Sequence, residues 1–229
     1  MLYILYDKNM QADISDNAEN VFFGFIELFK NGPCYVDQDE LSESLSSQDI
    51  EGILKNSFGS DVPALAYSDV FNAVNAKQKN FLRDFLHKIP QRMFVFLYRQ
   101  NLNYGHWCTM FEHPKTGELY VFDSYGKKKP DEYILSGSYD IKALGQDAPY
   151  LLECFVNSNY DTIVWNDHRF QQNGLEIQTC GKWCVVRLVC SWLTIDEFND
   201  CIEKIVKNNN TTPDAIVCVM YDVLRQSFS

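Results

Sequence analysis

The feature that most constrains the fold is the apolar run at 180–193, which follows Thr179 and opens with Cys180 and Gly181. A helix that is apolar on nearly all sides must be covered by other elements. The few polar residues in the run are Lys182, Arg187 and Ser191. A thiol at a helix start lies at the positive end of the backbone dipole, which favours the thiolate. We therefore expect a buried central helix with a reactive cysteine at its N-terminus.

Short segments rich in aromatic and β-branched residues precede this helix at 93–98, 107–111 and 119–122. Turn-forming residues separate them, so we expect three sequential antiparallel strands, with a further strand at 162–165. His106 lies at the start of one strand and Asp123 at the end of the next. A hairpin can bring these two side chains together despite their separation in sequence.

Capping residues predict the other helices. One helix begins near Ser46, presents Ile50, Ile53 and Leu54 to the core and ends within 56–59. A second is expected at 75–87. Two more follow the central helix, the first capped by Thr194 with Glu197 and the last beginning at Thr212-Pro213-Asp214. We expect a variable region at 126–159 and an irregular loop before Thr179.

The residues His106, Asp123 and Cys180 occur in an order that suits a cysteine hydrolase. A thiolate attacks an amide efficiently when a base takes the thiol proton and returns it to the leaving amine. His106 is the candidate base, and Asp123 would hold the other ring nitrogen. The backbone N–H of Cys180 and the side chain of Gln171 or Gln172 could stabilise the oxyanion.

Each residue also has a simpler interpretation. A free cysteine is more often a small buried hydrophobic residue, His106 could be a satisfied histidine at a strand start, and Asp123 could form a turn. Their joint occurrence in one order favours catalysis. A papain-like order with Cys34 before His113 or His168 is weaker, because Cys34 follows a proline in a turn and precedes no clear helix.

We expect neither a metal nor a cofactor. Cys180 and Cys184 would share a helical face, but no paired Cys-x-x-Cys and no matching histidine cluster completes a tetrahedral zinc site. With no N-terminal pattern of a secretory signal, the eight cysteines are expected to be free thiols in a protein that is not secreted.

Length and charge limit the function classes further. A chain of 229 residues with 46% apolar residues can form one substantial core, and no apolar run approaches the roughly 20 residues that span a bilayer. The net charge of −11 argues against nucleic-acid binding. The basic run 127–129 is interpreted as a solvated loop.

Several motifs together resemble one family. They are Gly105-His106-Trp107, Val121-Phe122-Asp123-Ser124, the segment 166–171, and Thr179-Cys180-Gly181-Lys182-Trp183-Cys184 with Arg187. The chain resembles the adenain-like cysteine peptidases, which join adenovirus protease with the SUMO-specific proteases, and above all those of virophages, large DNA viruses and Polinton-type transposons. The resemblance covers most of residues 45 to 225.

The resemblance implies an α+β fold with a central mixed, largely antiparallel sheet flanked by helices. His106 would be the general base, Asp123 its orienting partner, Cys180 the nucleophile and a glutamine the oxyanion donor. Gln171 is preferred to Gln172 because it follows Arg169-Phe170, as the family's glutamine follows a basic and an apolar residue. The SUMO-specific enzymes usually have Asp before the nucleophile, whereas this chain has Thr179, and its spacing from glutamine to cysteine is longer than usual.

By the same resemblance we expect residues 1–44 to be an N-terminal extension or cover and residues 45–229 to be the peptidase domain. The implied function is cleavage of viral capsid or core precursor proteins during virion maturation, by a monomer in the virion and the infected cell's cytoplasm. The alternative is an isopeptidase that removes SUMO-like or ubiquitin-like modifiers. A binding protein on an inactivated scaffold is disfavoured, because every chemical position is filled.

Overall fold

The computed structural model describes residues 24–25, 29, 36–99, 105–126, 142–174 and 176–227. Its centre is a five-stranded mixed sheet with the order β1-β2-β3-β4-β5. The strands are β1 (Ala64–Ala66), β2 (Met93–Arg99), β3 (Gly105–Glu112), β4 (Leu119–Phe122) and β5 (Ile163–Trp165). The three central strands are antiparallel, and each outer strand is parallel to its neighbour. The predicted α+β class with a mixed sheet is confirmed.

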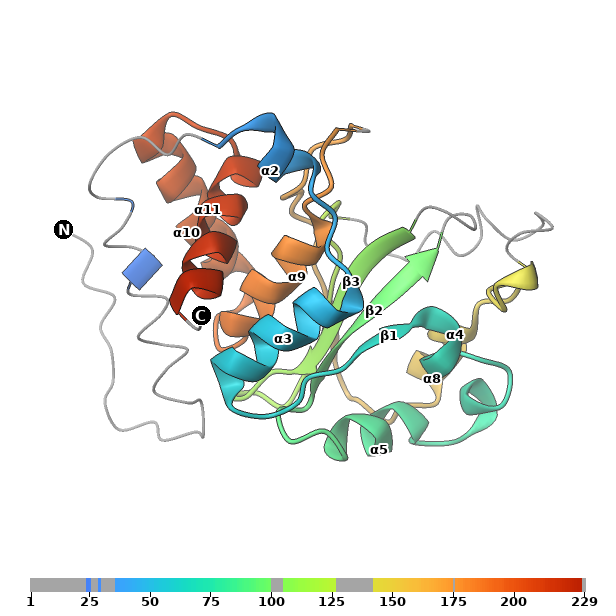
Figure 1. Ribbon diagram of the computed structural model, residues 1–229. Coiled ribbons are helices and arrows are strands. Elements are labelled where there is room, and N and C mark those ends of the chain that lie inside the picture. The colour runs from blue at the N-terminus through green and yellow to red at the C-terminus, as the bar shows by residue number, and fades with distance from the viewer. Residues whose placement is uncertain are drawn as a thin grey trace.

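Helices cover both faces of this sheet (Figure 1). One face packs against α3 (Ser47–Phe58), α9 (Cys180–Val189), α10 (Ile195–Asn209) and α11 (Pro213–Ser227). The other packs against α4 (Tyr67–Val70), α5 (Phe81–His87) and α8 (Tyr150–Val156). Two short helices complete the described elements, α2 (Gln38–Ser42) and the 3-10 helix η1 (Asn75–Lys77).

Successive side chains of each strand point to opposite faces of the sheet, so the core has two layers. Val95, Trp107 and Phe111 face the layer that contains α9, whereas Phe96 and Met110 face the layer that contains α5. Helix α9 lies within the first layer, and every residue from 181 to 189 is buried. The prediction of a central covered helix is therefore confirmed.

Local capping signals located several helices. Ser46 and Asp49 form a capping box at the start of α3, and Thr194 and Glu197 form one at the start of α10. The N–H of Ala215 binds the hydroxyl of Thr212 at the start of α11, as expected for an N-cap. These helices begin where the sequence predicts.

Contacts between residues of different elements shift other helix boundaries from their predicted positions. The expected helix 75–87 is two pieces, η1 and α5, because Asn80 adopts a left-handed conformation (φ 64°) and its N–H binds the carbonyl of Asn157. Helix α9 ends at Val189 rather than at 193, because the guanidinium of Arg187 binds the carbonyls of Cys190 and Leu193 and stabilises a turn. The region 126–159 contains α8, which was not predicted, and β1 was also not predicted.

Described residues before position 45 pack against the rest of the fold. Phe25 and Phe29 belong to its core, and α2 packs against α11. The boundary at 45 remains a prediction. Cys34 and the basic run 127–129 lie outside the described residues. Within the described ranges, no helix combines the length and the apolar character needed to cross a membrane.

Candidate active site

The candidate site lies where the N-terminus of α9 meets the start of β3. The register pairs Thr109 with Phe122, the last residue of β4, so the first residues of β3 extend beyond β4. Strand β3 packs against α9, whose first residue is Cys180. Gly181, next in the helix, packs against Leu45, where a Cβ would lie 3.1 Å from the leucine side chain. A residue without a side chain thus allows this close approach.

His106 and Asp123 form the hydrogen bond that the hairpin predicts. The Nε2 of His106 lies 2.7 Å from the Oδ1 of Asp123, and the residue His106 is 6% exposed. Burial lowers the pKa of His106, but the carboxylate and the Cys108 side chain raise it, and the net result is a pKa well above the ordinary value. Because Nε2 is occupied by Asp123, Nδ1 is the ring nitrogen left to exchange a proton with Cys180.

The Cys180 thiol is activated by its surroundings. Burial raises its pKa, but a hydrogen bond from the His106 side chain and the imidazolium charge lower it, as do the backbone N–H groups of Trp107 and Gly181. The net pKa is below the ordinary thiol value. Burial instead raises the pKa of the thiols of Cys108, Cys184, Cys190, Cys201 and Cys218. Of these thiols, Cys180 alone has a pKa shifted toward the thiolate, the form that a nucleophilic cysteine needs.

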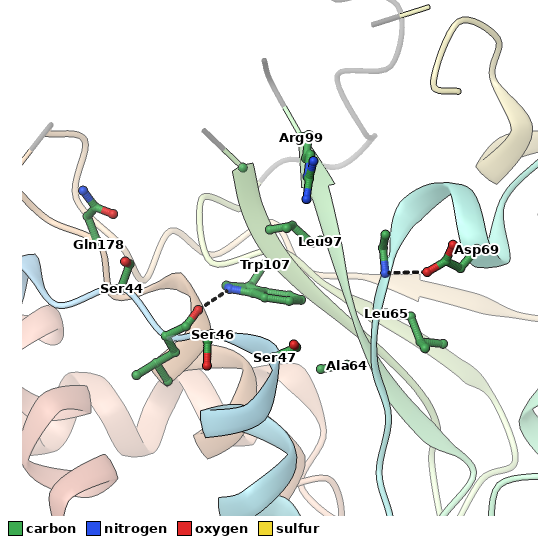
Figure 2. Close-up of a pocket in the computed structure, with 13 residues that line it drawn as sticks. Ser44, Ser46, Ser47, Ala64, Leu65, Asp69, Leu97, Arg99, Trp107 and Gln178 are labelled. Atoms are coloured by element: carbon green, nitrogen blue, oxygen red, sulfur yellow. Dashed lines mark hydrogen bonds between the residues drawn. The ribbon is translucent and has the colours of Figure 1, made fainter. Parts of the chain in front are cut away.

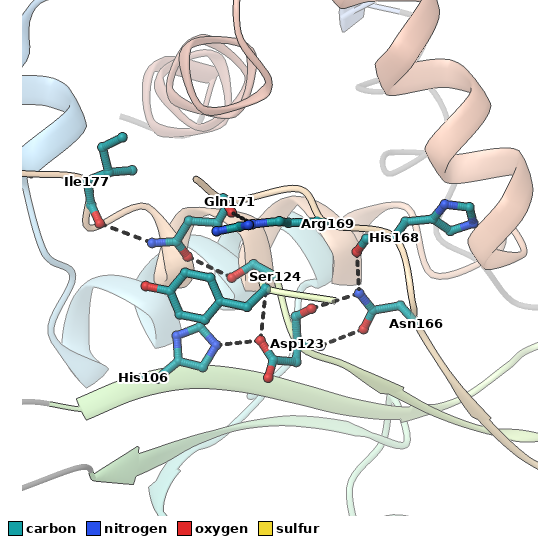
Figure 3. A network of polar contacts seen from close by, with 9 residues as sticks. His106, Asp123, Ser124, Asn166, His168, Arg169, Gln171 and Ile177 are labelled. Atoms are coloured by element: carbon teal, nitrogen blue, oxygen red, sulfur yellow. Dashed lines mark hydrogen bonds and ion pairs between the residues drawn. The ribbon is translucent and has the colours of Figure 1, made fainter. Parts of the chain in front are cut away.

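Asp123 is held from two sides (Figure 3). Its backbone N–H donates to Oδ1 of Asn166 and its carbonyl accepts from Nδ2, each at 2.7 Å. The backbone N–H of Tyr125 donates to the Asp123 carboxylate at 2.8 Å. The Tyr125 ring also stacks on the His106 imidazole, with centroids 4.6 Å apart. These contacts fix the carboxylate behind the imidazole.

The structure distinguishes the two candidate glutamines. Gln171 is 1% exposed, its Oε1 accepts a hydrogen bond from Ser124 at 2.7 Å, and its Nε2 donates to the carbonyl of Ile177 at 3.1 Å (Figure 3). It therefore connects the segment after Asp123 with the loop before Cys180. The side chain of Gln172 is exposed. An amide nitrogen carries two hydrogens, so Gln171 has one N–H beyond its bond to Ile177.

Ser124, Tyr125 and Asn166 are site residues to which the sequence assigned no separate role. Ser124 and Tyr125 follow Asp123 directly, and that proximity was the available signal. Asn166 lay inside a segment used only for the resemblance. Its contact with Asp123 depends on the parallel pairing of β4 and β5, which no local pattern reveals.

His106, Cys108 and Asp123 place potential metal ligands within 4.8 Å of one another, the one such group among the residues described. The 2.7 Å contact from Nε2 to Oδ1 is a hydrogen bond. A zinc ion bound to both atoms at about 2.0–2.2 Å would force them apart and break that bond. The hydrogen-bonded pair accounts for the cluster, and we assign no metal to it.

A groove of about 490 Å³ adjoins the site (Figure 2). It runs between the segment before α3, strand β1 and the start of β3, and the indole N–H of Trp107 donates to the carbonyl of Leu45 across its floor. It includes Trp107, the residue after His106, and Gln178, two residues before Cys180. The lining residues are Ser44–Ser47, Ala64–Ala66, Asp69, Leu97, Arg99, Gly105, Trp107 and Gln178.

Comparison with known proteins gives distant matches, and no model of a protein family matches the chain. The uncharacterized protein V9 of Sputnik virophage is 29% identical over 131 residues, which cover 57% of this chain and 74% of that protein. Matched solved structures include the SUMO protease Ulp1 with its catalytic cysteine oxidised to a sulfonic acid (13% identity, TM-score 0.38, 96% of this chain and 99% of that one).

The ASFV pS273R protease matches with 10% identity and a TM-score of 0.38, covering 83% of this chain and 69% of that one. The C-terminal Ulp1 protease domain in complex with Smt3, the yeast ortholog of SUMO, matches with 13% identity and a TM-score of 0.37, covering 97% and 100%. The similarities are too low to transfer site residues, which rest on the contacts given above.

Proposed function

We propose that this chain is a cysteine endopeptidase that cleaves polypeptides through Cys180, His106 and Asp123. One observation carries the proposal. A thiol with a lowered pKa starts a buried helix beside an imidazole whose far nitrogen is bound by a carboxylate. This arrangement supplies a nucleophile, a base and an orienting group.

The geometry supports the following mechanism. The Cys180 thiolate attacks the scissile carbonyl carbon, and the carbonyl electron pair moves to the oxygen. The backbone N–H of Cys180 and the Gln171 amide stabilise that oxyanion. His106 then gives its Nδ1 proton to the amine as the C–N bond breaks, leaving a thioester. Water, activated by His106, attacks the thioester, releases the carboxylic acid and restores the thiol.

The substrate we propose is a capsid or core precursor that is processed during virion maturation, in the virion or the infected cell's cytoplasm. The similarity of this chain to a protein of Sputnik virophage supports a viral setting. The groove beside Trp107 and Gln178 is a place where an extended segment next to the scissile bond could bind. His106, Asp123 and Cys180 come together within a single chain, so the proposed chemistry needs no residue from a second copy.

The first test is the variant Cys180→Ala. We expect it to abolish cleavage of the precursor while the melting temperature stays close to that of the wild type, because the substitution removes only the nucleophile. Cys201→Ala is the matched control, since Cys201 is a half-buried thiol on α10 with a raised pKa. It should retain cleavage. Turnover by Cys180→Ala would contradict the proposal.

The same assay separates the two kinds of peptidase. Wild-type protein is incubated with the precursor and, in parallel, with fusions of SUMO and ubiquitin. We expect cleavage of the precursor alone. Cleavage of the modifier fusions without cleavage of the precursor would contradict the proposed role in maturation and would favour an isopeptidase that removes modifiers. The proposed roles of Cys180, His106 and Asp123 would be unaffected.

A further inference from the structure

One buried carboxylate has no role in the mechanism above. Asp214 lies in the first turn of α11 and is 1% exposed. It forms no ion pair with any other residue that the structure describes. Its three hydrogen bonds instead come from residues around the nucleophile. Burying a carboxylate without an opposite charge is costly, so its position calls for an explanation.

The three donors flank the catalytic groups. The hydroxyl of Thr179, the residue before the nucleophile, donates to Oδ1 at 2.5 Å, and the Trp183 indole donates to the same oxygen at 3.3 Å. The backbone N–H of Gln172, the residue after Gln171, donates to Oδ2 at 2.9 Å. One carboxylate thus connects the two segments that carry Gln171 and Cys180.

The contact with Thr179 also changes the start of α9. Thr179 is the N-cap of this helix, and an N-cap hydroxyl ordinarily accepts a hydrogen bond from an N–H of the first turn. Here the hydroxyl donates to Asp214 and makes no capping bond. The first N–H groups of a helix have no partner within the helix, so they remain available to an anion near Cys180.

We infer that Asp214 is a positioning residue for peptide hydrolysis: by binding the Thr179 hydroxyl it holds the residue before Cys180, and so fixes the oxyanion-binding N–H of Cys180. Through Gln172 it also fixes the backbone that carries Gln171. This inference rests on the proposed function. It assigns to Asp214 a contribution to the oxyanion site and none to the reactivity of the thiol, which depends on His106.

The test separates these two properties. Full-length variants are assayed for kcat and KM with a fluorogenic peptide taken from the cleavage site of the precursor, and for alkylation of Cys180 by iodoacetamide, which needs a thiolate but no oxyanion site. For Asp214→Ala we expect kcat to fall about 10²-fold, in the range for loss of an oxyanion donor, with KM and the alkylation rate within about threefold of the wild type. Asp214→Asn, which keeps one acceptor oxygen, should lose about tenfold.

The double variant Asp214→Ala with Thr179→Val provides the sharper comparison. Thr179 and Asp214 act through one shared hydrogen bond, so removing the hydroxyl as well should cost nothing further, and we expect kcat within about twofold of that of Asp214→Ala alone. Asp222→Ala is the matched control. Asp222 lies on the same helix, is partly exposed and pairs with Arg225, so kcat should not change.

Three results would overturn the inference: an unchanged kcat in both Asp214 variants, a fall in alkylation equal to the fall in kcat, or a further fall of about tenfold in the double variant. If Asp214→Ala does not fold, Asp214→Asn decides by the same criteria of kcat and alkylation. Absence of hydrolysis by the wild type would refute the proposed function itself, whereas wild-type hydrolysis with active Asp214 variants would refute only the role of Asp214.

Discussion

At the scale of single residues, the position of Gln171 depends on one hydroxyl. Ser124 donates to the Oε1 of Gln171, which orients the amide so that its nitrogen points toward the loop before Cys180. The side chain of Gln172 has no such contact and is exposed, while its backbone N–H is bound to Asp214. Gln171 therefore contributes its side chain to the contacts around Cys180, whereas Gln172 contributes its backbone N–H.

This difference gives a prediction about the oxyanion donor. We expect Gln171→Ala to lower kcat by about 10²–10³-fold, the usual cost of removing one preorganised donor. Gln172→Ala removes only an exposed side chain and should change kcat by less than about twofold. Steady-state kinetics on a peptide substrate measure both values. A loss in Gln172→Ala that equals or exceeds that in Gln171→Ala would assign the donor to Gln172.

Single residues also show what sequence alone could reveal about the site. Cys180 was found from a local pattern, a cysteine at the start of an apolar helix. His106 and Asp123 were found because a hairpin pairs neighbouring strands. Asp214 was read only as part of a helix start, because its partner Thr179 lies in another element and nothing local connects the two.

At the scale of elements, the site is the junction of a strand and a helix. Strand β3 supplies His106 and the N–H of Trp107, and α9 supplies Cys180 and the N–H of Gly181. The imidazole has a raised pKa and the thiol a lowered one. Both shifts favour the ion pair of a thiolate and an imidazolium over the neutral pair.

The junction predicts the pH dependence of hydrolysis. Activity rises with pH as Cys180 loses its proton and falls at higher pH as His106 loses its own. In Asp123→Asn the imidazolium loses the carboxylate that raises its pKa, so the falling limb of kcat/KM should move to lower pH. Asp161→Asn, on an exposed residue before β5, should leave the profile unchanged. A falling limb that stays in place in Asp123→Asn would contradict the view that the Asp123 carboxylate raises the pKa of His106.

Elements with their own start signals could be predicted, and elements defined by neighbours could not. Helices α3 and α10 begin at capping boxes formed within a few residues. Strand β1 has three residues and pairs in parallel with β2, so its sequence carries almost no periodic signal. The break between η1 and α5 depends on a bond from Asn80 to Asn157, which belongs to the loop after α8.

At the scale of the whole molecule, net charge governs long-range partners. With 20 lysines and arginines against 31 acidic residues, the chain carries a formal charge of −11. A protein that binds DNA releases counterions through clustered cations, and the free energy of that release is largest at low salt. A net negative chain repels DNA most strongly under the same conditions. DNA should therefore not act as an activator.

The corresponding experiment measures peptide hydrolysis with and without double-stranded DNA, at low and at moderate salt. We expect no increase in kcat/KM at either salt concentration, because repulsion at low salt and screening at moderate salt both prevent a stable complex. Heparin, a polyanion without bases, serves as the control and should likewise have no effect. A stimulation by DNA that weakens as salt rises would show that local cations on this acidic chain form a true polyanion site, and net charge would then be the wrong predictor of its partners.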